Sequence, residues 1–396
     1  MNKLYRWQAL DAQGHMQRGH VHSTGPQLAQ LQLMRQGLQG IRLQRSHPWL
    51  LPPLRARDIS LLTRQLATLL AAGLPLLQAL QLLGQGLQHP RLQDLLQQLR
   101  GSLESGLSLS AACAQHPKYF SQVYVQLVAA GEQGGLLDVM LARLASHLES
   151  TQALHAKVRA ALTYPAAVLL VAAVVVGILM VKVVPTFGQV FASYGAALPL
   201  PTLMVMGVSE WLQAYGLWLV LALPALCVAL QRVWGRCPAC RTRIQRWLLG
   251  WPLLGPLVLQ TCLTRWTRTL ATLCAAGVPL VQALASAGQA AGHVVFEEAS
   301  ELLMRDIAQG QALSHAMGGL QLYPPMVLQL CAVGEASGTL DEMLAKAADF
   351  LDVQVQTRLA SLMNLLEPAL MVVLGSLIGG MVVAMYLPIF NMGQVI

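Results

Sequence analysis

The chain has little charge for its length, and this shortage excludes most soluble classes of protein. Only 11% of its 396 residues are Asp, Glu, Lys or Arg, while 55% are hydrophobic, and the mean hydropathy is +0.51. A soluble domain has about 25% charged residues. The chain is therefore too apolar to be wholly soluble, and it is too long for one domain of about 150 residues.

Motifs of common enzymes are also missing. None of the five lysines follows a glycine, so the phosphate-binding GxxxxGK[ST] loop is absent and a P-loop ATPase is excluded. No nucleophile, base and orienting residue can be combined into a catalytic set. We therefore expect no enzymatic activity, no catalytic residue, no cofactor and no bound metal.

Three uncharged stretches are long enough to cross a bilayer, which needs about 20 mostly apolar residues. They predict transmembrane helices over 162–184, 211–231 and 366–387. The second is the weakest because it contains Gln213 and Pro224, and a buried core helix is the alternative for each. The first 60 residues contain no sustained hydrophobic run, so we expect no signal peptide.

Arginines predict the orientation of these spans. Residues 231–246 contain five Arg and no acidic residue, whereas 183–209 carry no charge. The positive-inside rule then places the N-terminus and 231–367 in the cytoplasm, with a loop over 185–209 and the tail 388–396 outside. The net charge of +8 thus indicates topology, and we expect no nucleic-acid partner.

A long segment occurs twice. The sequence RTLATLCAAGVPLVQAL begins at Arg268, and RQLATLLAAGLPLLQAL begins at Arg64, with 13 of 17 residues identical. Similarity continues at an offset of 204 and then 203 as far as Pro165 and Pro368. Both copies run from the cytoplasm into an outward span, so the chain needs one extra crossing to return. The span over 211–231 is that spacer.

Each copy predicts a small helical bundle because its apolar residues recur at helical spacing. In the first helix, Leu61, Leu62 and Leu66 are expected on the apolar face and Thr63 on the polar face. Gly73 should end that helix and Pro75 should begin the next. In the first copy the expected helices cover 59–72, 75–88, 91–104, 108–115 and 119–130, with a long helix from about 136 into the first span.

The resulting fold class is an all-α membrane protein. Two homologous cytoplasmic bundles, 58–161 and 262–364, each lead into a transmembrane helix, and the spacer helix joins them. Residues 1–50 differ, because they alternate like strands and then include a short helical pattern at 27–35. We expect a small separate N-terminal α/β module there.

Glu132 and Glu335 stand in matching G-E-x-x-G turns, closed by Gly135 and Gly338, before the long helices. They could contact a partner or a metal. Alternatively, each carboxylate could satisfy amides at the start of the next helix, where the helix dipole favours an anion.

The membrane segments offer further structural candidates. Pro165 and Pro368 begin the two matched spans, and Gly375 with Gly379 forms a GxxxG pattern that permits close helix packing. Glu149 and Gln152 share a helical face before the first span. They could hold a cation, although a solvated face is the simpler interpretation.

Cysteines and histidines do not form a persuasive site. Cys237 and Cys240 have redox spacing but no second pair or nearby His, so we expect free thiols. His15, His20 and His22 are expected as surface residues on strands.

Several of these motifs together resemble a known family, the inner-membrane platform proteins shared by type IV pili and type II secretion. The motifs are the duplicated ATLLAAGLPLLQAL and ATLCAAGVPLVQAL, the turns GEQGG and GEASG, ALTYP, VVPTF and the terminal VVAMYLPIFNMG. The ending MYLPIF-x-x-G is more similar to the pilus branch.

The resemblance implies a non-enzymatic assembly platform in the bacterial inner membrane. Its expected partners are a cytoplasmic hexameric ATPase, pilin or pseudopilin membrane helices, other inner-membrane assembly proteins and further copies of itself. A secondary transporter is the main rival class, but three spans and parallel copies fit it poorly. A receptor or signalling scaffold is a second rival, although no output domain is recognisable.

Overall fold

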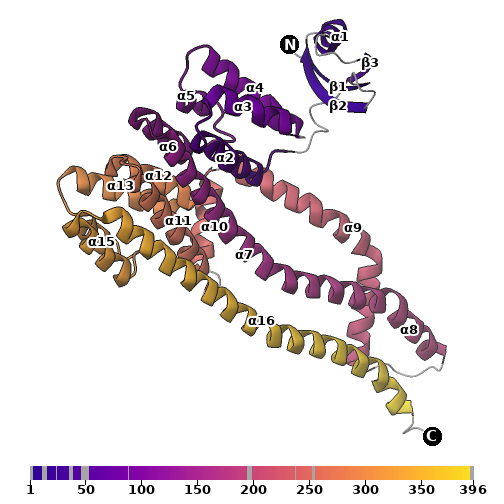
Figure 1. The fold of residues 1–396 in the computed structure, drawn as a ribbon. Coiled ribbons are helices and arrows are strands. Elements are labelled where there is room, and N and C mark those ends of the chain that lie inside the picture. The colour runs from indigo at the N-terminus through magenta and orange to yellow at the C-terminus, as the bar shows by residue number, and fades with distance from the viewer. Residues whose placement is uncertain are drawn as a thin grey trace. The chain divides into compact units, whose positions relative to one another are not determined.

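The computed structural model describes residues 3–10, 16–23, 25–34, 39–45, 53–87, 89–193, 199–236, 238–251 and 255–392, which are mostly helical (Figure 1). They divide into two compact units. Unit 1 comprises residues 1–152, 267–290 and 303–345, and unit 2 comprises 153–266, 291–302 and 346–396.

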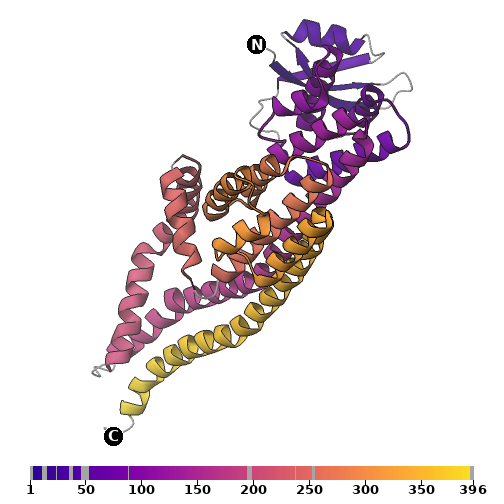
Figure 2. The same cartoon turned by 90° about the vertical axis from the view of Figure 1, so that its left-hand side faces the viewer.

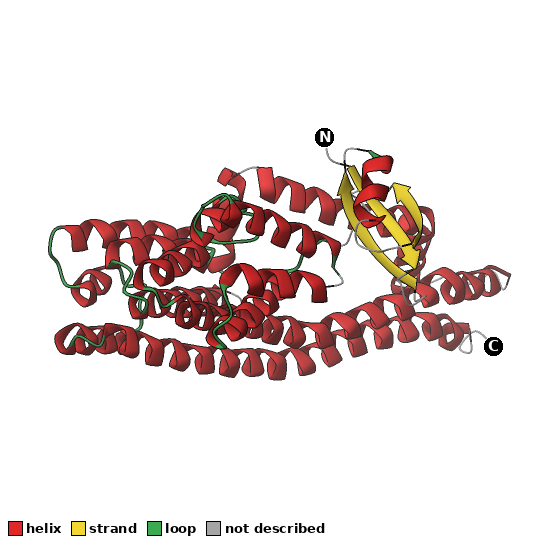
Figure 3. Cartoon of the chain, turned by 45° about the horizontal axis from the view of Figure 1, so that its top comes forward, coloured by secondary structure: helices red, strands yellow, loops and turns green. Residues whose placement is uncertain are grey.

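The N-terminal segment forms a small antiparallel sheet, drawn in yellow in Figure 3. The strands β1 (Lys3–Leu10), β2 (Met16–Ser23) and β3 (Gln39–Arg45) have the order β2-β1-β3, and α1 (Pro26–Met34) lies between β2 and β3 in the chain. The pairing of β1 with β2 runs from Lys3–Ser23 to Leu10–Met16, while the pairing with β3 shifts between Gln8 and Leu10.

The first copy of the repeat forms five short helices, as the apolar spacing predicts. They are α2 (Ala56–Ala71), α3 (Leu76–Gly86), α4 (Pro90–Glu104), α5 (Leu109–Ala114) and α6 (Gln122–Gly134). Gly73 has a φ of 82°, a left-handed conformation that suits glycine, and Pro75 is the N-cap of α3. The predicted boundary between these two helices is confirmed.

The predicted apolar face of α2 is wrong at two positions. Leu61 is 56% exposed, whereas Thr63 is fully buried. The Thr63 hydroxyl donates to the carbonyl of Ile59 and lies 3.2 Å from the hydroxyl of Tyr124. Because Thr63 satisfies its hydroxyl in this way, it can occupy the core, and the buried face is centred one residue later than its leucines indicate.

The second copy repeats the order of helices. It comprises α11 (Gly255–Ala275), α12 (Leu280–Ala291), α13 (Val294–Ala308), α14 (Leu313–Gly319) and α15 (Pro325–Ser337). Within unit 1 the two copies touch, because the hydroxyl of buried Ser286 donates to Oε1 of Gln126 at 2.7 Å.

Long helices follow both bundles. The helix α7 (Leu137–Ile178) continues through a π-helical turn, η2 (Leu179–Val183), into α8 (Val184–Ser193), and α16 (Leu340–Met392) is unbroken (Figures 1 and 2). The predicted long helix from about 136 into the first span is confirmed. In unit 2, Leu154, Leu257, Val355 and Leu359 form a core that joins α7, α11 and α16.

The predicted loop over 185–209 is not an irregular segment, and its place outside the membrane stays a prediction. Most of it is helical, because α8 extends to Ser193 and α9 (Leu200–Arg236) begins at Leu200. The lack of charge in 183–209 bears on topology and not on secondary structure, so it does not reveal these helices. A further helix, α10 (Pro238–Leu249), follows α9.

Among the described residues, two helical runs are long and apolar enough to cross a membrane, Leu137–Val190 and Leu340–Pro388. Their apolar side chains are exposed, including Leu170 at 68% and Val372 at 69%. Such exposure suits a lipid environment rather than a water-facing surface. The predicted span 211–231 lies within α9, where several side chains fall outside the described part, and it stays a prediction.

Candidate functional site

The strongest candidate site is a turn that occurs once in each copy. Gly131 and Glu132 lie in the last turn of α6, and Gly135 ends this helix with a φ of 65°. In the second copy, Gly334 and Glu335 lie in the last turn of α15, and Gly338 ends it with a φ of 72°. Positive φ favours glycine, which explains the Gly at the end of both motifs.

In the first copy the Glu132 carboxylate reaches back 23 residues to the start of α5. It accepts hydrogen bonds from the backbone N–H of Leu109 at 2.5 Å, the N–H of Ser110 at 3.2 Å and the hydroxyl of Ser110 at 2.5 Å. The N-cap residue Ser108 takes the next amide, that of Ala111. These are amides that a helix leaves without an internal partner, and an anion is favoured at this end.

Glu335 does the same in the second copy. Its carboxylate accepts from the N–H of Leu313 at 2.5 Å, the N–H of Ser314 at 3.0 Å and the hydroxyl of Ser314 at 2.5 Å. The N-cap of α14 is Ala312, which has no side-chain acceptor. The start of α14 therefore depends on Glu335 more than the start of α5 depends on Glu132.

The predicted capping role is right in kind but wrong in location. The amides belong to the short helix that precedes the turn, not to the long helix that follows it. Within each bundle, the carboxylate therefore links the helix that carries it to the short helix that precedes it in the chain. The matched serines Ser110 and Ser314 are the sequence signal for this contact.

The first glycine of each motif brings the long helix close to the bundle. A Cβ atom on Gly131 would lie 3.0 Å from Cβ of Met140 and 3.1 Å from Cα of Leu137 in α7. On Gly334 it would lie 2.8 Å from Cα of Leu340 in α16, which is closer than real contacts allow. The turn thus joins three elements, namely the short helix, its neighbour and the start of the long helix.

A buried thiol lies near each carboxylate. Burial, and then the nearby Glu132, raises the pKa of Cys113 to about 12, and burial and Glu335 raise that of Cys331 to about 12. Both thiols stay protonated at neutral pH, so they act as small apolar side chains rather than nucleophiles.

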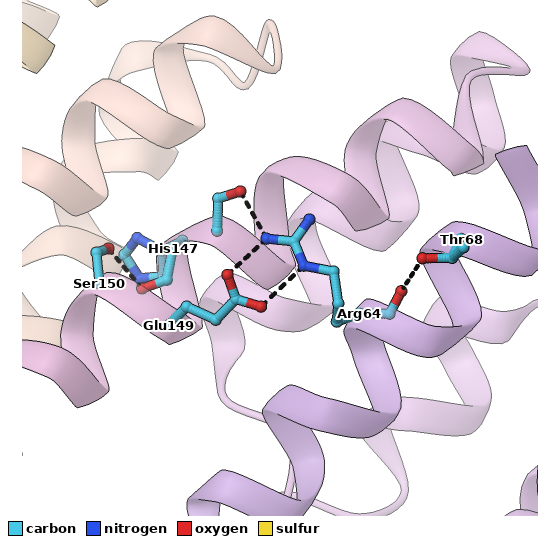
Figure 4. Close-up of polar contacts among 6 residues, drawn as sticks. Arg64, Thr68, His147, Glu149 and Ser150 are labelled. Carbon is cyan, nitrogen blue, oxygen red and sulfur yellow. Dashed lines mark hydrogen bonds and ion pairs between the residues drawn. The ribbon is translucent and has the colours of Figure 1, made fainter.

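A second polar cluster connects α2 to α7 (Figure 4). Nε and Nη2 of Arg64 donate to the two carboxylate oxygens of Glu149 at 2.8 and 2.7 Å, and Nη2 also donates to the hydroxyl of Ser146. Arg64, first by its hydrogen bond and then by its charge, lowers the pKa of Glu149. Gln152 donates to the carbonyl of Ala56 at 2.9 Å.

These contacts argue against Glu149 and Gln152 as a cation site, whereas the exposed side chain of Glu149 agrees with the alternative of a solvated face. The guanidinium of Arg64 already occupies both oxygens of Glu149. Sequence reasoning missed this pair because its partners are 85 residues apart. The repeated segment begins at Arg64, which was the available signal.

The remaining candidates lie on the long helices. Pro165 is buried inside α7, and Pro368 is exposed inside α16. A Cβ on Gly375 or Gly379 would meet no described atom within 4 Å, so no part of the described chain packs against them. Their role as a contact for a partner helix stays a prediction.

Other predicted positions fall outside what the structure describes. His15 and Cys237 lie outside the described residues, and the side chains of His20, His22 and Cys240 are not described either. His20 and His22 pair in the sheet with Arg6 and Leu4. Among the residues described, Cys113, Cys262, Cys274 and Cys331 are free thiols.

Comparison with known proteins defines the class of this duplicated architecture. A family model described as type II secretion system (T2SS), protein F matches residues 62–185 and again residues 266–388. The two matches coincide with the two copies and end at matching prolines. The chain belongs to this family.

Relatives over the whole length extend this result. The chain is 40% identical to a type IV pilus assembly protein PilC of Pseudomonas aeruginosa, over 93% of this chain and 100% of the relative. It is 41% identical to a type 4 fimbrial assembly protein PilC of Pseudomonas putida, over 100% and 99%. It is 35% identical to a type II secretion system protein F of Pseudomonas aeruginosa, over 87% and 84%.

Proposed function

We propose that this protein is the platform of a type IV pilus assembly machine in the bacterial inner membrane. The observation that carries the proposal is the full-length similarity to relatives named for type IV pilus assembly, which includes both copies and the segments between them. The fold supports a scaffolding role rather than catalysis, because its polar clusters are engaged in holding helices together.

The proposed topology has three spans, 162–184, 211–231 and 366–387, with the bundles 58–161 and 262–364 and the module 1–50 in the cytoplasm. The arginine-rich segment 231–246 supports this orientation through the positive-inside rule. The C-terminal tail 388–396 would then be periplasmic.

The proposed mechanism is mechanical coupling. A hexameric motor ATPase would bind the bundles, and pilin membrane helices would meet the spans, with other assembly proteins and further copies of the chain around them. The continuity of α7 and α16 supports this proposal, because an unbroken helix transmits a movement of the bundle into the membrane. Pro165 and Pro368 are the points at which such helices bend most easily.

Within this mechanism the turns at Glu132 and Glu335 fix each bundle to its long helix. The close contact of Gly334 with Leu340 and the hydrogen bonds of Glu335 support this role. Gly375 and Gly379 would offer a flat surface to a pilin helix, since small residues allow helices to approach closely in a membrane.

Deletion of the gene in its source bacterium tests the proposal. We expect surface pili to disappear, and a plasmid copy to restore them, as counted by electron microscopy. Normal piliation in the deletion strain would refute the pilus role. Co-purification of the ATPase with the full chain tests the coupling step separately.

The equivalent platform of a type II secretion system is the second candidate. The 35% identity with a type II secretion system protein F supports it. In that case the deletion would leave pili intact and would block the release of exoproteins into the medium.

A further inference from the structure

Each repeated long helix contains a second proline near its C-terminal end. Pro185 and Pro388 are 203 positions apart, the same offset as Pro165 and Pro368. Because proline has no N–H, it leaves a carbonyl of the preceding turn without its helical donor. In α16 that carbonyl belongs to Ala384.

The first copy has the same defect in a different register. In η2 the N–H of Val184 donates to the carbonyl of Leu179, five residues back. In this register the donor for the carbonyl of Met180 would be residue 185, which is proline. Each repeat therefore leaves one carbonyl unpaired near its C-terminal end.

The spacer helix α9 supplies a hydroxyl to both carbonyls. Oγ1 of Thr202 donates to the Ala384 carbonyl at 2.5 Å, and Oγ of Ser209 donates to the Met180 carbonyl. Nε2 of Gln213 donates to the Ser209 hydroxyl at 3.2 Å. Thr202 and Ser209 are only 3% and 2% exposed. All these residues belong to unit 2.

The positions on α9 match this task. Residues 202, 209 and 213 are 7 and then 4 apart, so they lie on one face of the helix. That face packs against η2 and α8 (Figures 1 and 2), where a Cβ on Gly188 would come within 2.7 Å of Met206. The contact is with the terminal methyl of Met206, so it shows that α8 and α9 lie close together at this point.

The earlier prolines differ in this respect. Among the described residues, no side-chain donor bonds the carbonyls of Ala161 or Asn364, which lie four residues before Pro165 and Pro368. The pairing of hydroxyl with unpaired carbonyl thus distinguishes the C-terminal prolines from the ones that begin the spans.

We propose that α9 is a clasp, formed by Thr202, Ser209 and Gln213, that holds the C-terminal ends of the two repeated membrane helices together. Thr202 and Ser209 are positioning residues that replace the hydrogen bonds lost at Pro388 and Pro185. Because Thr202 and Ser209 are buried, water has little access to the two carbonyls, which therefore depend on these hydroxyls. This gives α9 a role beyond that of a return crossing, and it explains the polar Gln213 in an apolar segment.

The clasp is tested on the purified full-length protein in lipid nanodiscs by the unfolding temperature. Thr202→Val removes the hydroxyl and keeps the shape, so we expect the midpoint to fall by about 1–6 °C, given the usual strength of interhelical hydrogen bonds. Thr202→Ser should keep the wild-type midpoint. The control is Thr186→Val, because the exposed Thr186 hydroxyl bonds the Lys182 carbonyl of its own helical run.

A double-mutant cycle separates the clasp from ordinary packing. Pro388→Ala returns a backbone N–H to the Ala384 carbonyl, so Thr202→Val should have no further effect in the P388A background. An equal loss in both backgrounds, or no loss in either, would overturn the proposal. If P388A does not fold, Ser209→Ala in the P185A background has the same two outcomes. The assay requires no pilus, so its result is independent of the proposed function.

Discussion

Replacement of Glu335 by Ala tests whether the repeated turn holds the second bundle together. The change removes the acceptor for two backbone amides and one hydroxyl at the start of α14. Loss of a helix N-cap costs about 1 kcal/mol, and a hydrogen bond to a charged group contributes about 1.5–3 kcal/mol. Water replaces part of this at a half-buried site, so we expect a loss of about 2 kcal/mol.

The matched variant in the first copy should be milder. Glu132→Ala also removes three hydrogen bonds, but Ser108 remains as the N-cap of α5. We expect a loss of about 1 kcal/mol there. Ser314→Ala removes only the hydroxyl contact to Glu335, so it should cost less than Glu335→Ala.

The assay is thermal unfolding of the full-length protein in nanodiscs, followed by tryptophan fluorescence. A loss of 2 kcal/mol corresponds to a fall of roughly 4–8 °C for a unit of 150–250 residues. Glu301→Ala, at an exposed position of α13, is the control and should leave the midpoint unchanged. An unchanged midpoint for Glu335→Ala combined with loss of ATPase binding would refute the structural role and favour a partner contact.

Two further predictions concern the same unit. Gly334→Ala should destabilise the protein more than Gly131→Ala in the same assay, because its Cβ would meet the Leu340 backbone at 2.8 Å. Equal unfolding midpoints for the two variants would contradict the closer approach of Gly334 to the Leu340 backbone. Glu149→Gln tests the ion pair with Arg64, which lowers the pKa of Glu149. The ion pair therefore stabilises the fold at pH values above the pKa that Glu149 has in the unfolded chain. This stabilisation is lost as the pH falls through the lower pKa that Glu149 has in the folded protein. Both side chains are more than a third exposed, so the variant's free energy of unfolding should be lower than that of the wild type by at most about 1 kcal/mol at pH 7. This difference should vanish in acid. A difference that does not change with pH would contradict the role of the ion pair.

The regular elements were predictable because local signals agree with the fold. Gly73 and Pro75 mark a helix boundary, and the apolar spacing after Ala56 indicates a helix whatever packs on it. The prediction of the buried face failed at Thr63, because hydropathy describes a side chain alone and takes no account of the hydrogen-bond partner that lets a hydroxyl be buried.

The contacts that build the site were less predictable. The motif of Glu132 is visible in the sequence, but the first backbone amide that its carboxylate binds lies 23 residues earlier. Only the folded bundle brings the two together. The helices in 185–209 were missed for a related reason. Ser209 and Thr202 look like loop residues until the carbonyls that they satisfy are known.

The central claim is that both copies of the bundle lie on the same side of the membrane, with α9 as the return crossing. Reporter fusions in the source bacterium test it directly, with alkaline phosphatase and green fluorescent protein fused after Ser193 and after Gly310. We predict phosphatase activity without fluorescence at Ser193, and fluorescence without phosphatase activity at Gly310. Phosphatase activity at Gly310 would place the second bundle outside and would contradict the account.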